Sequence, residues 1–472
     1  MSDSSGDAVD YGTATTLPAK TFFVSMLTRD IELDDAILDL LDNCIDGVVR
    51  SHSGQDEMPY EGFEAIVRIS EDYFELEDNC GGIPIGIARS RAFRLGRQTG
   101  DIVDQDERTV GVYGIGMKRA IFKLGRNSTV KSISDQPFTV NINSEWLDSD
   151  EWTPLALEPY RPPDGARLGT RITVHELYPG VAAKLADVSW IEKLRQYISD
   201  HYALIIAKGF SVKIEAHGVT SKPITPAPFV LAAAGELGGD GVQPLIYRGN
   251  IEGVEVEVYA GLLSQPLDED QISERHGEQD GRSPAGWTIA CNDRVVVSRD
   301  RTYLTGWGTA GVPSYHGQYS VIAGIALLWA DHVQELPLTT TKRGLDASSI
   351  VYARLLDVMR EATKSLTSFT NKWKTKEARR EPLGDTKQKS LSELRAFDGV
   401  TKVKNGKLKG LYTYKPELPT PPQEKRRPRV SFAAEKEEIA ALRDYFEDEE
   451  LSNSEVGRLA FDEALYEAGY AK

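Results

Sequence analysis

The stretch Asp39-Leu40-Leu41-Asp42-Asn43-Cys44-Ile45-Asp46-Gly47 decides how the rest of the chain is interpreted. Its apolar residues recur every three or four positions, which predicts an amphipathic helix with one stripe packed on a core. Residues 39, 42, 43 and 46 are expected on the opposite face, lining a cleft or solvent. A carboxylate beside an amide oxygen suits a hard cation and an activated water. Taken alone, the helix is explained equally well as a solvated polar face.

Two glycine-bearing stretches follow this helix. Glu75-Leu76-Glu77-Asp78-Asn79-Cys80-Gly81-Gly82-Ile83-Pro84 is typical of a strand that ends in a turn. Gly111-Val112-Tyr113-Gly114-Ile115-Gly116-Met117-Lys118 is typical of a glycine loop that opens a helix, where backbone amides can bind triphosphate oxygens. Each stretch also has a purely structural explanation: a hairpin turn for the first, and a helix end packed tightly on a sheet for the second.

The ordered set resembles the GHKL ATPases, the superfamily that includes DNA gyrase, MutL, heat-shock chaperone and MORC-type ATPases. The matching patterns are Asp-x-x-x-Asn-x-x-Asp, Asp-Asn-x-Gly-Gly-Ile and Gly-x-Tyr-Gly-x-Gly-x-Lys, and the likeness covers roughly residues 1–185. Bacterial MORC-like ATPases look most similar. The resemblance implies a two-layer α/β (α+β) sandwich that binds ATP and Mg²⁺, with an ATP lid formed by the polar segment 94–110.

Individual roles are also implied by the resemblance. Asp78 would bind the adenine amino group, supported by a water and the hydroxyl of Thr170. Asn43 would hold Mg²⁺, and Asp39 stands where the family has the glutamate that activates water. Because an aspartate is one methylene shorter, slow hydrolysis is expected. The other predicted nucleotide-binding residues are Asp46, Gly82, Ile83, Gly111, Tyr113, Gly114, Ile115, Gly116, Met117 and Lys118. The chain departs from the family at Cys80, where a glycine is usual.

The domain organisation is expected to run from a disordered N-terminus (1–17) through the ATP-binding domain (18–185) to a transducer-like α/β domain (186–370). Strands are predicted over 65–70, 73–77, 127–133, 138–143 and 167–174, and then over 211–216, 244–247, 252–260, 286–290 and 294–298, before a helix near 349–366. In the second domain, Lys342 resembles the switch lysine that reaches the γ-phosphate. An exposed loop lysine is the alternative.

Charge is distributed unevenly along the chain. The formal charge is −17, yet residues 371–430 contain 17 Lys and Arg against 7 Asp and Glu, a net of +10, so the remainder carries −27. This balance argues against a nucleic-acid-binding surface over the whole protein. Residues 371–428, which are rich in proline towards their end, are predicted to be a flexible basic linker, and residues 371–433 to be a possible DNA contact.

Residues 429–472 predict a strand followed by two helices and resemble the ribbon-helix-helix fold. Such a unit cannot bury its core alone, so a homodimer is implied. Residues 431–472 carry a net charge of −8, which opposes phosphate binding, and dimerisation without base reading therefore stays open beside DNA recognition.

The sequence lacks a run of eighteen apolar residues and a secretory signal pattern, so no membrane association and a cytoplasmic location are expected. The preferred hypothesis is a Mg²⁺-dependent GHKL ATPase that forms a nucleotide-gated dimeric clamp, with fold-level analogy pointing to DNA handling or phage defence. The alternative is an ATP-binding sensor or scaffold with little turnover that recruits a separate effector protein.

Overall fold

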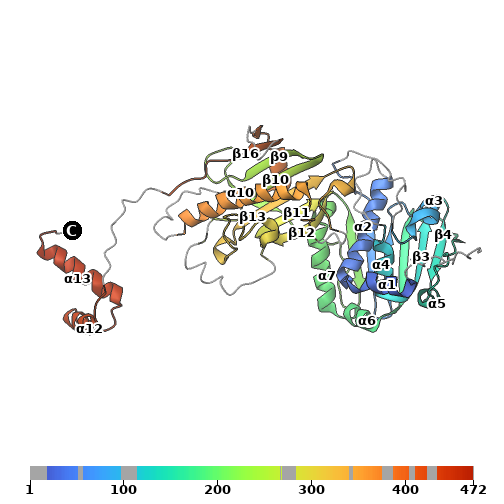
Figure 1. Ribbon diagram of the computed structural model, residues 1–472, viewed down its shortest axis with the longest axis horizontal. Coiled ribbons are helices and arrows are strands. Elements are labelled where there is room, and N and C mark those ends of the chain that lie inside the picture. Colours follow the sequence, from blue (N-terminus) through green and yellow to red (C-terminus); the bar gives the residue numbers. More distant parts are fainter. Residues whose placement is uncertain are drawn as a thin grey trace, which may run out of the picture. The chain divides into compact units, whose positions relative to one another are not determined.

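The computed structural model describes residues 19–51, 57–96, 114–265, 267, 283–339, 344–374, 386–402, 410–421 and 433–470. The chain divides into two compact units, residues 1–421 and 422–472. The first unit is a mixed α/β structure built on two large sheets (Figure 1). None of the helices in the described ranges combines the length and the hydropathy of a membrane span.

The N-terminal sheet contains seven strands in the described residues, in the order β5-β4-β3-β6-β2-β1-β7. The strands are β1 Glu64–Ile69, β2 Tyr73–Asp78, β3 Gly125–Ile133, β4 Phe138–Ile142, β5 Glu158–Pro159, β6 Gly169–Leu177 and β7 Ser211–Ala216. Strand β7 runs parallel to β1, and the other pairs are antiparallel. The predicted strands of this region are confirmed with small shifts of their ends.

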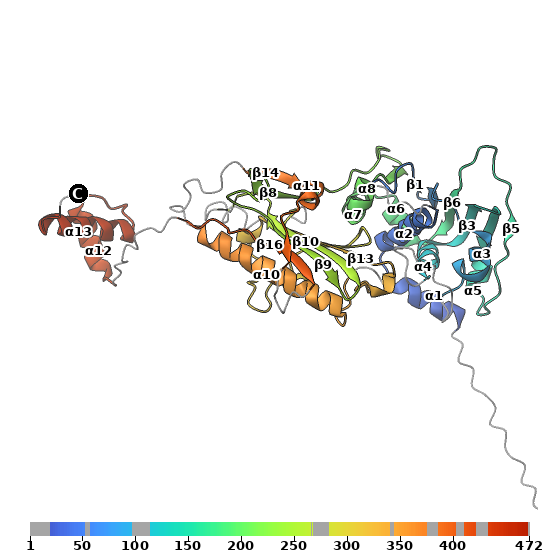
Figure 2. The same ribbon diagram turned by 90° about the horizontal axis from the view of Figure 1, so that it is seen from above.

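Helices cover one face of this sheet (Figures 1 and 2). They are α1 Lys20–Arg29, α2 Leu33–Ser51, α3 Ile85–Ile87, α4 Gly116–Leu124, α5 Ser144–Asp148, α6 Pro179–Leu185, α7 Val188–His201 and α8 Ala203–Ala207, with a π-helical turn over Ala88–Ala92. Buried apolar side chains alternate along β1 and β2, and the apolar face of the sheet forms one core with α2 and α4. The opposite face is polar: Arg68 pairs there with Glu75, Glu77 and Glu215.

The N-terminal body extends past the predicted boundary at residue 185. Helix α7 begins beyond that point, and Ile191, Leu194 and Ile198 of α7 are buried in the same core as α2. Strand β7 then adds an edge to the sheet, and the core continues to Ile224. The boundary was placed too early because the parallel pairing of β7 with β1 joins distant segments and leaves no local sequence signal.

The second sheet contains nine strands in the described residues. They are β8 Val230–Ala234, β9 Leu245–Ile251, β10 Val254–Leu262, β11 Gly286–Cys291, β12 Arg294–Asp300, β13 Ile322–Trp329, β14 Thr386–Ser390, β15 Thr401–Lys402 and β16 Leu411–Tyr414. Short 3₁₀ turns lie at Tyr303–Thr305, Gly317–Tyr319 and Val333–Glu335. The strands predicted over 244–247, 252–260, 286–290 and 294–298 are confirmed as β9, β10, β11 and β12, whereas β13 was not predicted. The strand predicted over 211–216 is confirmed as β7, which belongs to the first sheet.

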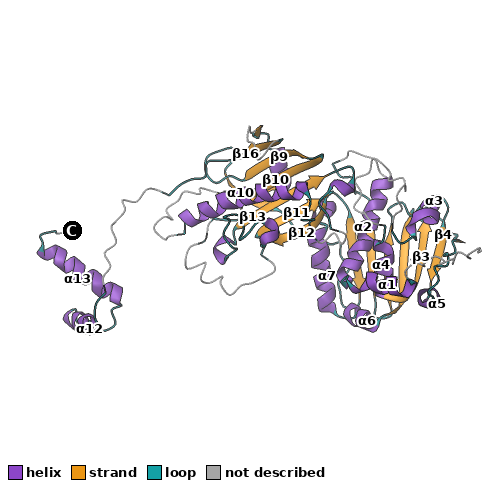
Figure 3. Ribbon diagram, in the orientation of Figure 1, coloured by secondary structure: helices purple, strands orange, loops and turns teal. Residues whose placement is uncertain are grey.

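Both faces of the second sheet are covered: Figure 3 shows α10 lying along its strands, and Figure 2 shows α11 on the side of the strands opposite α10. Helix α10 (Ile350–Lys372), predicted near 349–366, packs on one face, where Leu328 of β13 is buried. Helix α11 (Leu391–Ala396) places Leu394 on the other face with Leu327. All eight residues of β13 are therefore buried, which explains its unbroken apolar sequence.

The prediction of a flexible linker over 371–428 is wrong for the described residues 386–402 and 410–421. Strand β14 pairs with β8, and β16 pairs with β9. Arg248 of β9 donates hydrogen bonds to the carbonyls of Leu394 and Phe397 at the end of α11. Strand β14 consists of polar residues and gains its stability from backbone pairing with β8, so its sequence shows no apolar alternation.

In its described residues, 433–470, the second unit contains two packed helices, α12 Lys436–Tyr445 and α13 Asn453–Glu467. The predicted start of α13 is confirmed: Ser452 caps the helix, and Glu455 bonds back to the backbone of Ser452. Val456 is buried, whereas Leu459 of the same helix is 38 % exposed. The predicted strand at 429–433 lies outside the described residues except for Ala433.

Candidate functional site

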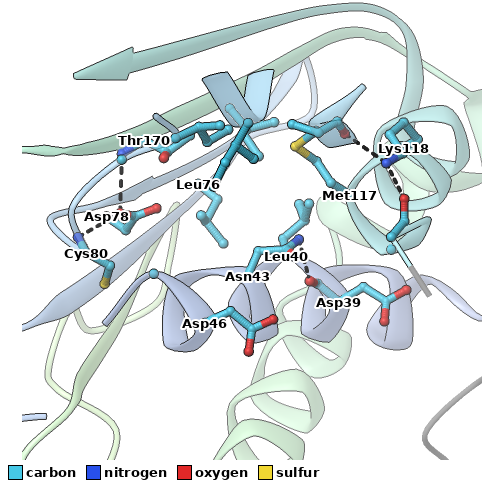
Figure 4. A pocket seen from close by; sticks show the side chains of 18 of the residues that line it. Asp39, Leu40, Asn43, Asp46, Leu76, Asp78, Cys80, Met117, Lys118 and Thr170 are labelled. Atoms are coloured by element: carbon cyan, nitrogen blue, oxygen red, sulfur yellow. Dashed lines mark hydrogen bonds between the residues drawn. The ribbon is translucent and has the colours of Figure 1, made fainter. Parts of the chain in front are cut away.

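A cavity of about 180 Å³ lies between helix α2, the end of strand β2 and the start of helix α4. Figure 4 shows Asp78, Cys80 and Thr170 at one end of the cavity and Met117 and Lys118 at the other. Twelve of the fifteen predicted site residues line it: Asp39, Asn43, Asp46, Asp78, Gly82, Ile83, Gly114, Ile115, Gly116, Met117, Lys118 and Thr170. The other three, Gly111, Tyr113 and Lys342, lie outside the described residues.

Helix α2 supplies the floor of the cavity. Every residue from Asp35 to Val48 is buried except Asn43, whose side chain is exposed at the cavity. The Nδ2 of Asn43 donates to the carbonyl of Asp39, 2.8 Å away. Because this bond orients the amide, its oxygen is the atom available to an incoming ligand. Asp46, one turn further along, is also buried and lines the cavity.

The side chain of Asp78 is partly buried, and its carboxylate is held by three donors. Its Oδ1 accepts the backbone N–H of Cys80 at 2.8 Å and that of Thr170 at 3.2 Å. The thiol of Cys44 donates to Oδ2 at 3.5 Å. Burial raises the pKa of Asp78 to about 6, although these hydrogen bonds oppose the shift. The carboxylate is thus fixed in orientation and is the hydrogen-bond acceptor at this end of the cavity.

The contact between Thr170 and Asp78 differs in its chemistry from the prediction. The resemblance led us to expect the Thr170 hydroxyl, but the structure places the main-chain N–H of this residue on Asp78. The preceding Gly169 explains the approach, because a Cβ there would lie 1.9 Å from the carbonyl oxygen of Asp78. The Gly-Thr pair therefore serves close contact between β6 and the end of β2.

Gly82, predicted as a nucleotide-binding residue, also has a structural role in the turn. Its φ is +71°, and a Cβ would lie 2.4 Å from the carbonyl oxygen of Ile133 on β3. The neighbouring Ile83 is tied to β3 through Ser132, whose hydroxyl accepts the Ile83 N–H at 2.7 Å. These contacts fix the turn that follows Asp78 against the sheet.

The start of α4 closes the other end of the cavity. Gly114, Ile115 and Gly116 line it with backbone, as predicted for a glycine loop. Lys118 is buried, and its ammonium donates to the carbonyls of Gly114 and Ala92, the latter at 2.8 Å. A cation and the amino end of a helix therefore converge here, which favours an anionic ligand.

Asp39 forms a buried ion pair with Arg119 of helix α4. The Oδ2 of Asp39 accepts Nη2 at 2.5 Å and Nε at 3.1 Å. Sequence reasoning missed Arg119, because nothing in the motif pattern distinguishes it from an exposed helix residue. It also missed two further cations of the lining, Arg50 and Arg91.

Asp42 is separated from the other polar residues of α2. We expected residues 39, 42, 43 and 46 to share one face, but Asp42 does not line the cavity. Its Oδ1 accepts Arg294 Nε at 2.9 Å and the Tyr202 hydroxyl at 2.6 Å. The helical repeat places Asp42 at the edge of the polar face, and two buried partners from distant segments turn it away.

No group of three or more His, Cys, Asp or Glu residues that could hold a metal occurs in the described parts of the chain. The predicted Mg²⁺ site is of another kind, because the amide of Asn43 is its single named protein ligand. Compared with known proteins, the sequence matches no family model and no curated protein.

Proposed function

We propose that the chain is a GHKL-type ATPase that binds ATP with Mg²⁺ in the cavity between α2, β2 and α4. One observation carries the proposal: three separated sequence motifs, chosen from the resemblance, supply residues that line a single cavity. Their order also gives the cavity two chemically different ends, with an acceptor at Asp78 and a cation with backbone amides at α4.

The end of the cavity at Asp78 suits an adenine ring. A carboxylate accepts a hydrogen bond from the exocyclic amino group of adenine, whereas guanine carries an acceptor oxygen in that position. Leu40, Leu76 and Ile172 provide apolar surface beside Asp78 for the faces of a base. Since Asp78 is held by Cys80, Thr170 and Cys44, binding would require little reordering of this carboxylate.

The opposite end suits phosphate and a magnesium ion. Mg²⁺ is commonly bound by one or two protein oxygens together with substrate phosphates and waters, so Asn43 beside a triphosphate is a sufficient anchor. When bound, the ion would neutralise phosphate charge. The cavity volume of about 180 Å³ is below the roughly 300 Å³ of a typical small-molecule site. Because the cavity is smaller than such sites, we expect it to widen when a nucleotide binds. The Lys118 ammonium would then exchange its two carbonyl partners for phosphate oxygens.

Isothermal titration of the full chain with a non-hydrolysable ATP analogue and Mg²⁺ tests the proposal. We expect binding by the unaltered protein and its loss in Asp78→Asn, which places an amide NH₂ against the adenine amino group. Asp148→Asn is the matched control, because Asp148 is an exposed carboxylate paired with Arg126 away from the cavity. Equal affinity in the Asp78 variant and the control would contradict the site.

A specific observation favours the second function, an ATP-binding sensor or scaffold with little turnover. Asp39, the residue expected to activate water, is engaged by Arg119 at 2.5 Å and is one methylene shorter than a glutamate. Both features reduce its reach towards a water. Single-turnover measurement of phosphate release separates the two functions: a sensor binds ATP as tightly but releases no phosphate above the Asp39→Asn background.

Assembly and biological role extend the proposal. We infer a homodimer through residues 429–472, whose two helices leave Tyr445, Phe461 and Tyr466 exposed. ATP would join the N-terminal bodies and close a clamp. A role in DNA handling or phage defence follows from the resemblance alone. Because residues 431–472 are acidic, we expect any DNA contact to be made by the basic residues 371–430 that precede them.

A further inference from the structure

We propose that Arg294 is a positioning residue that makes the cavity helix α2 and the second sheet move as one. The inference rests on the proposed nucleotide binding, because it concerns how a change at that cavity reaches the second sheet. It names the buried pair of Arg294 and Asp42 as the link.

Arg294 is attached rigidly to the second sheet. It is the first residue of β12 and follows a tight turn, in which Asn292 and Asp293 have positive φ values of 46° and 65°. The side chain of Asn292 accepts the N–H of Ala330 at 3.1 Å and donates to its carbonyl at 3.2 Å. These paired bonds fix the turn to the end of β13, so Arg294 cannot shift without the strands behind it.

The other end of the link is helix α2. Arg294 Nε donates to Asp42 Oδ1 at 2.9 Å, and the two side chains are only 6 % and 2 % exposed. Tyr202 strengthens the contact, because its single hydroxyl proton is shared between Asp42 Oδ1, 2.6 Å away, and the carbonyl oxygen of Leu38, 2.8 Å away. The guanidinium also lies over the Tyr202 ring, 4.6 Å from its centre. Asp42 belongs to the same turn of helix as Asn43 and Asp39, which line the cavity.

The character of this contact favours transmission of a movement. An apolar interface allows small sliding, but a buried ion pair is stable only in a narrow range of geometry, since separation leaves two desolvated charges. Burial lowers the pKa of Arg294, yet the ion pair and hydrogen bond with the Asp42 carboxylate oppose it and the net shift is upward. The arginine therefore stays charged, and a displacement of α2 must carry β12 with it.

A second contact between the same turn and the N-terminal body supports the assignment. The carboxylate of Asp293 accepts Lys208 Nζ at 2.5 Å and Trp329 Nε1 at 3.1 Å. Lys208 follows helix α8, which packs against β12. The turn over residues 292–293 is thus held from both sides, by the end of α8 and by its own sheet.

The test uses variants that remove the ion pair without leaving a lone buried charge. Asp42→Asn with Arg294→Met replaces both members, whereas either change alone should lower the melting temperature because one charge stays unpaired. Amide hydrogen exchange over residues 294–300 is then compared with and without a non-hydrolysable ATP analogue and Mg²⁺. We expect the analogue to slow this exchange in the unaltered protein and to have no such effect in the double variant, which still binds it.

Asp200→Asn with Arg299→Met is the matched control, because this pair also joins β12 to the N-terminal body but contacts α7 instead of α2. The control should keep the slowed exchange. The inference is overturned if the analogue still slows exchange in the double variant of Asp42 and Arg294. It is also overturned if the unaltered protein binds the analogue and its exchange is not slowed; in both cases the proposed function stands. Absence of analogue binding in the unaltered protein would overturn the proposed function, and the inference with it.

Discussion

The carboxylate of Asp39 and the guanidinium of Arg119 form a buried ion pair at the floor of the cavity, with Nη2 2.5 Å from Oδ2. The pair links the two helices that frame the site, α2 and α4. It places a cation where phosphate is proposed to bind, and it occupies the residue proposed to activate water. Turnover therefore depends on how this pair rearranges when a nucleotide enters.

Replacing Asp39 by Asn should reduce hydrolysis and spare binding. The variant keeps the shape of the side chain but cannot take up a proton from water, and general-base catalysis typically contributes about 10²–10⁴-fold. We expect a comparable fall in the steady-state rate, with the affinity for an ATP analogue little changed. Phosphate release and isothermal titration measure the two quantities. Unaltered turnover would mean that another group activates the water.

ATP binding should weaken below about pH 6. The pKa of Asp78 is raised by burial to about 6, so the carboxylate that accepts the adenine amino group is protonated below that value. Because the folded-state pKa of Asp78 lies above the ordinary value of 3.8, ionising this carboxyl is less favourable in the folded than in the unfolded protein. The free energy of unfolding therefore falls by on the order of 3 kcal/mol as the pH rises from about 4 to 6. Measuring the affinity for the ATP analogue at several values between about pH 5 and 8 tests the predicted weakening of binding. A flat profile would exclude Asp78 as the acceptor.

Gly169→Ala should disrupt the Asp78 end of the cavity. Its Cβ would lie 1.9 Å from the carbonyl oxygen of Asp78, so β6 or β2 must move apart. We expect a loss of about 1–3 kcal/mol of stability, as for other overpacked sites, together with weaker analogue binding. Gly180→Ala is the control, because a Cβ there meets nothing within 4 Å. Urea unfolding curves of equal midpoint for the two variants would contradict the close contact.

Lys342→Ala should impair closure over the nucleotide. In the resemblance this lysine reaches the γ-phosphate, so its loss should lower turnover while the adenine end still binds. Arg343→Ala is the adjacent control and should leave the rate near that of the unaltered protein. Steady-state phosphate release measures both variants, and a rate that responds to Arg343 instead of Lys342 would reassign the switch residue.

The intact protein should be a dimer without nucleotide, held by residues 429–472. In one copy of the second unit, large apolar residues such as Phe461 and Tyr466 stay exposed, and each costs roughly 1.5–3 kcal/mol relative to burial. Removing residues 429–472 should give a monomer that dimerises only with an ATP analogue and Mg²⁺. Light scattering at micromolar concentration reports the mass. An intact apo monomer would contradict the assembly.

The sequence by itself determined the local elements and many of the residues that line the cavity. The apolar period of α2, the strand before Asp78 and the glycine loop before Lys118 each carry their own signal, because hydrophobic repeat and turn chemistry act over a few residues. The Ser452 cap was equally readable from its spacing to Glu455. Twelve of the predicted site residues line the cavity, whereas Asp42 was expected there and does not line it, and the three lining cations Arg50, Arg91 and Arg119 were missed.

Tertiary structure alone decided how the polar groups are paired. The helical repeat places Asp39 and Asp42 near one another, yet Arg119 holds the first at the cavity and Arg294 draws the second towards the other sheet. The edge strand β14 likewise exists through backbone bonds to β8, although its own residues are polar. Such pairings join residues far apart in the chain. Their energy depends on burial and geometry that arise only once the sheets have packed, so no local pattern announces them.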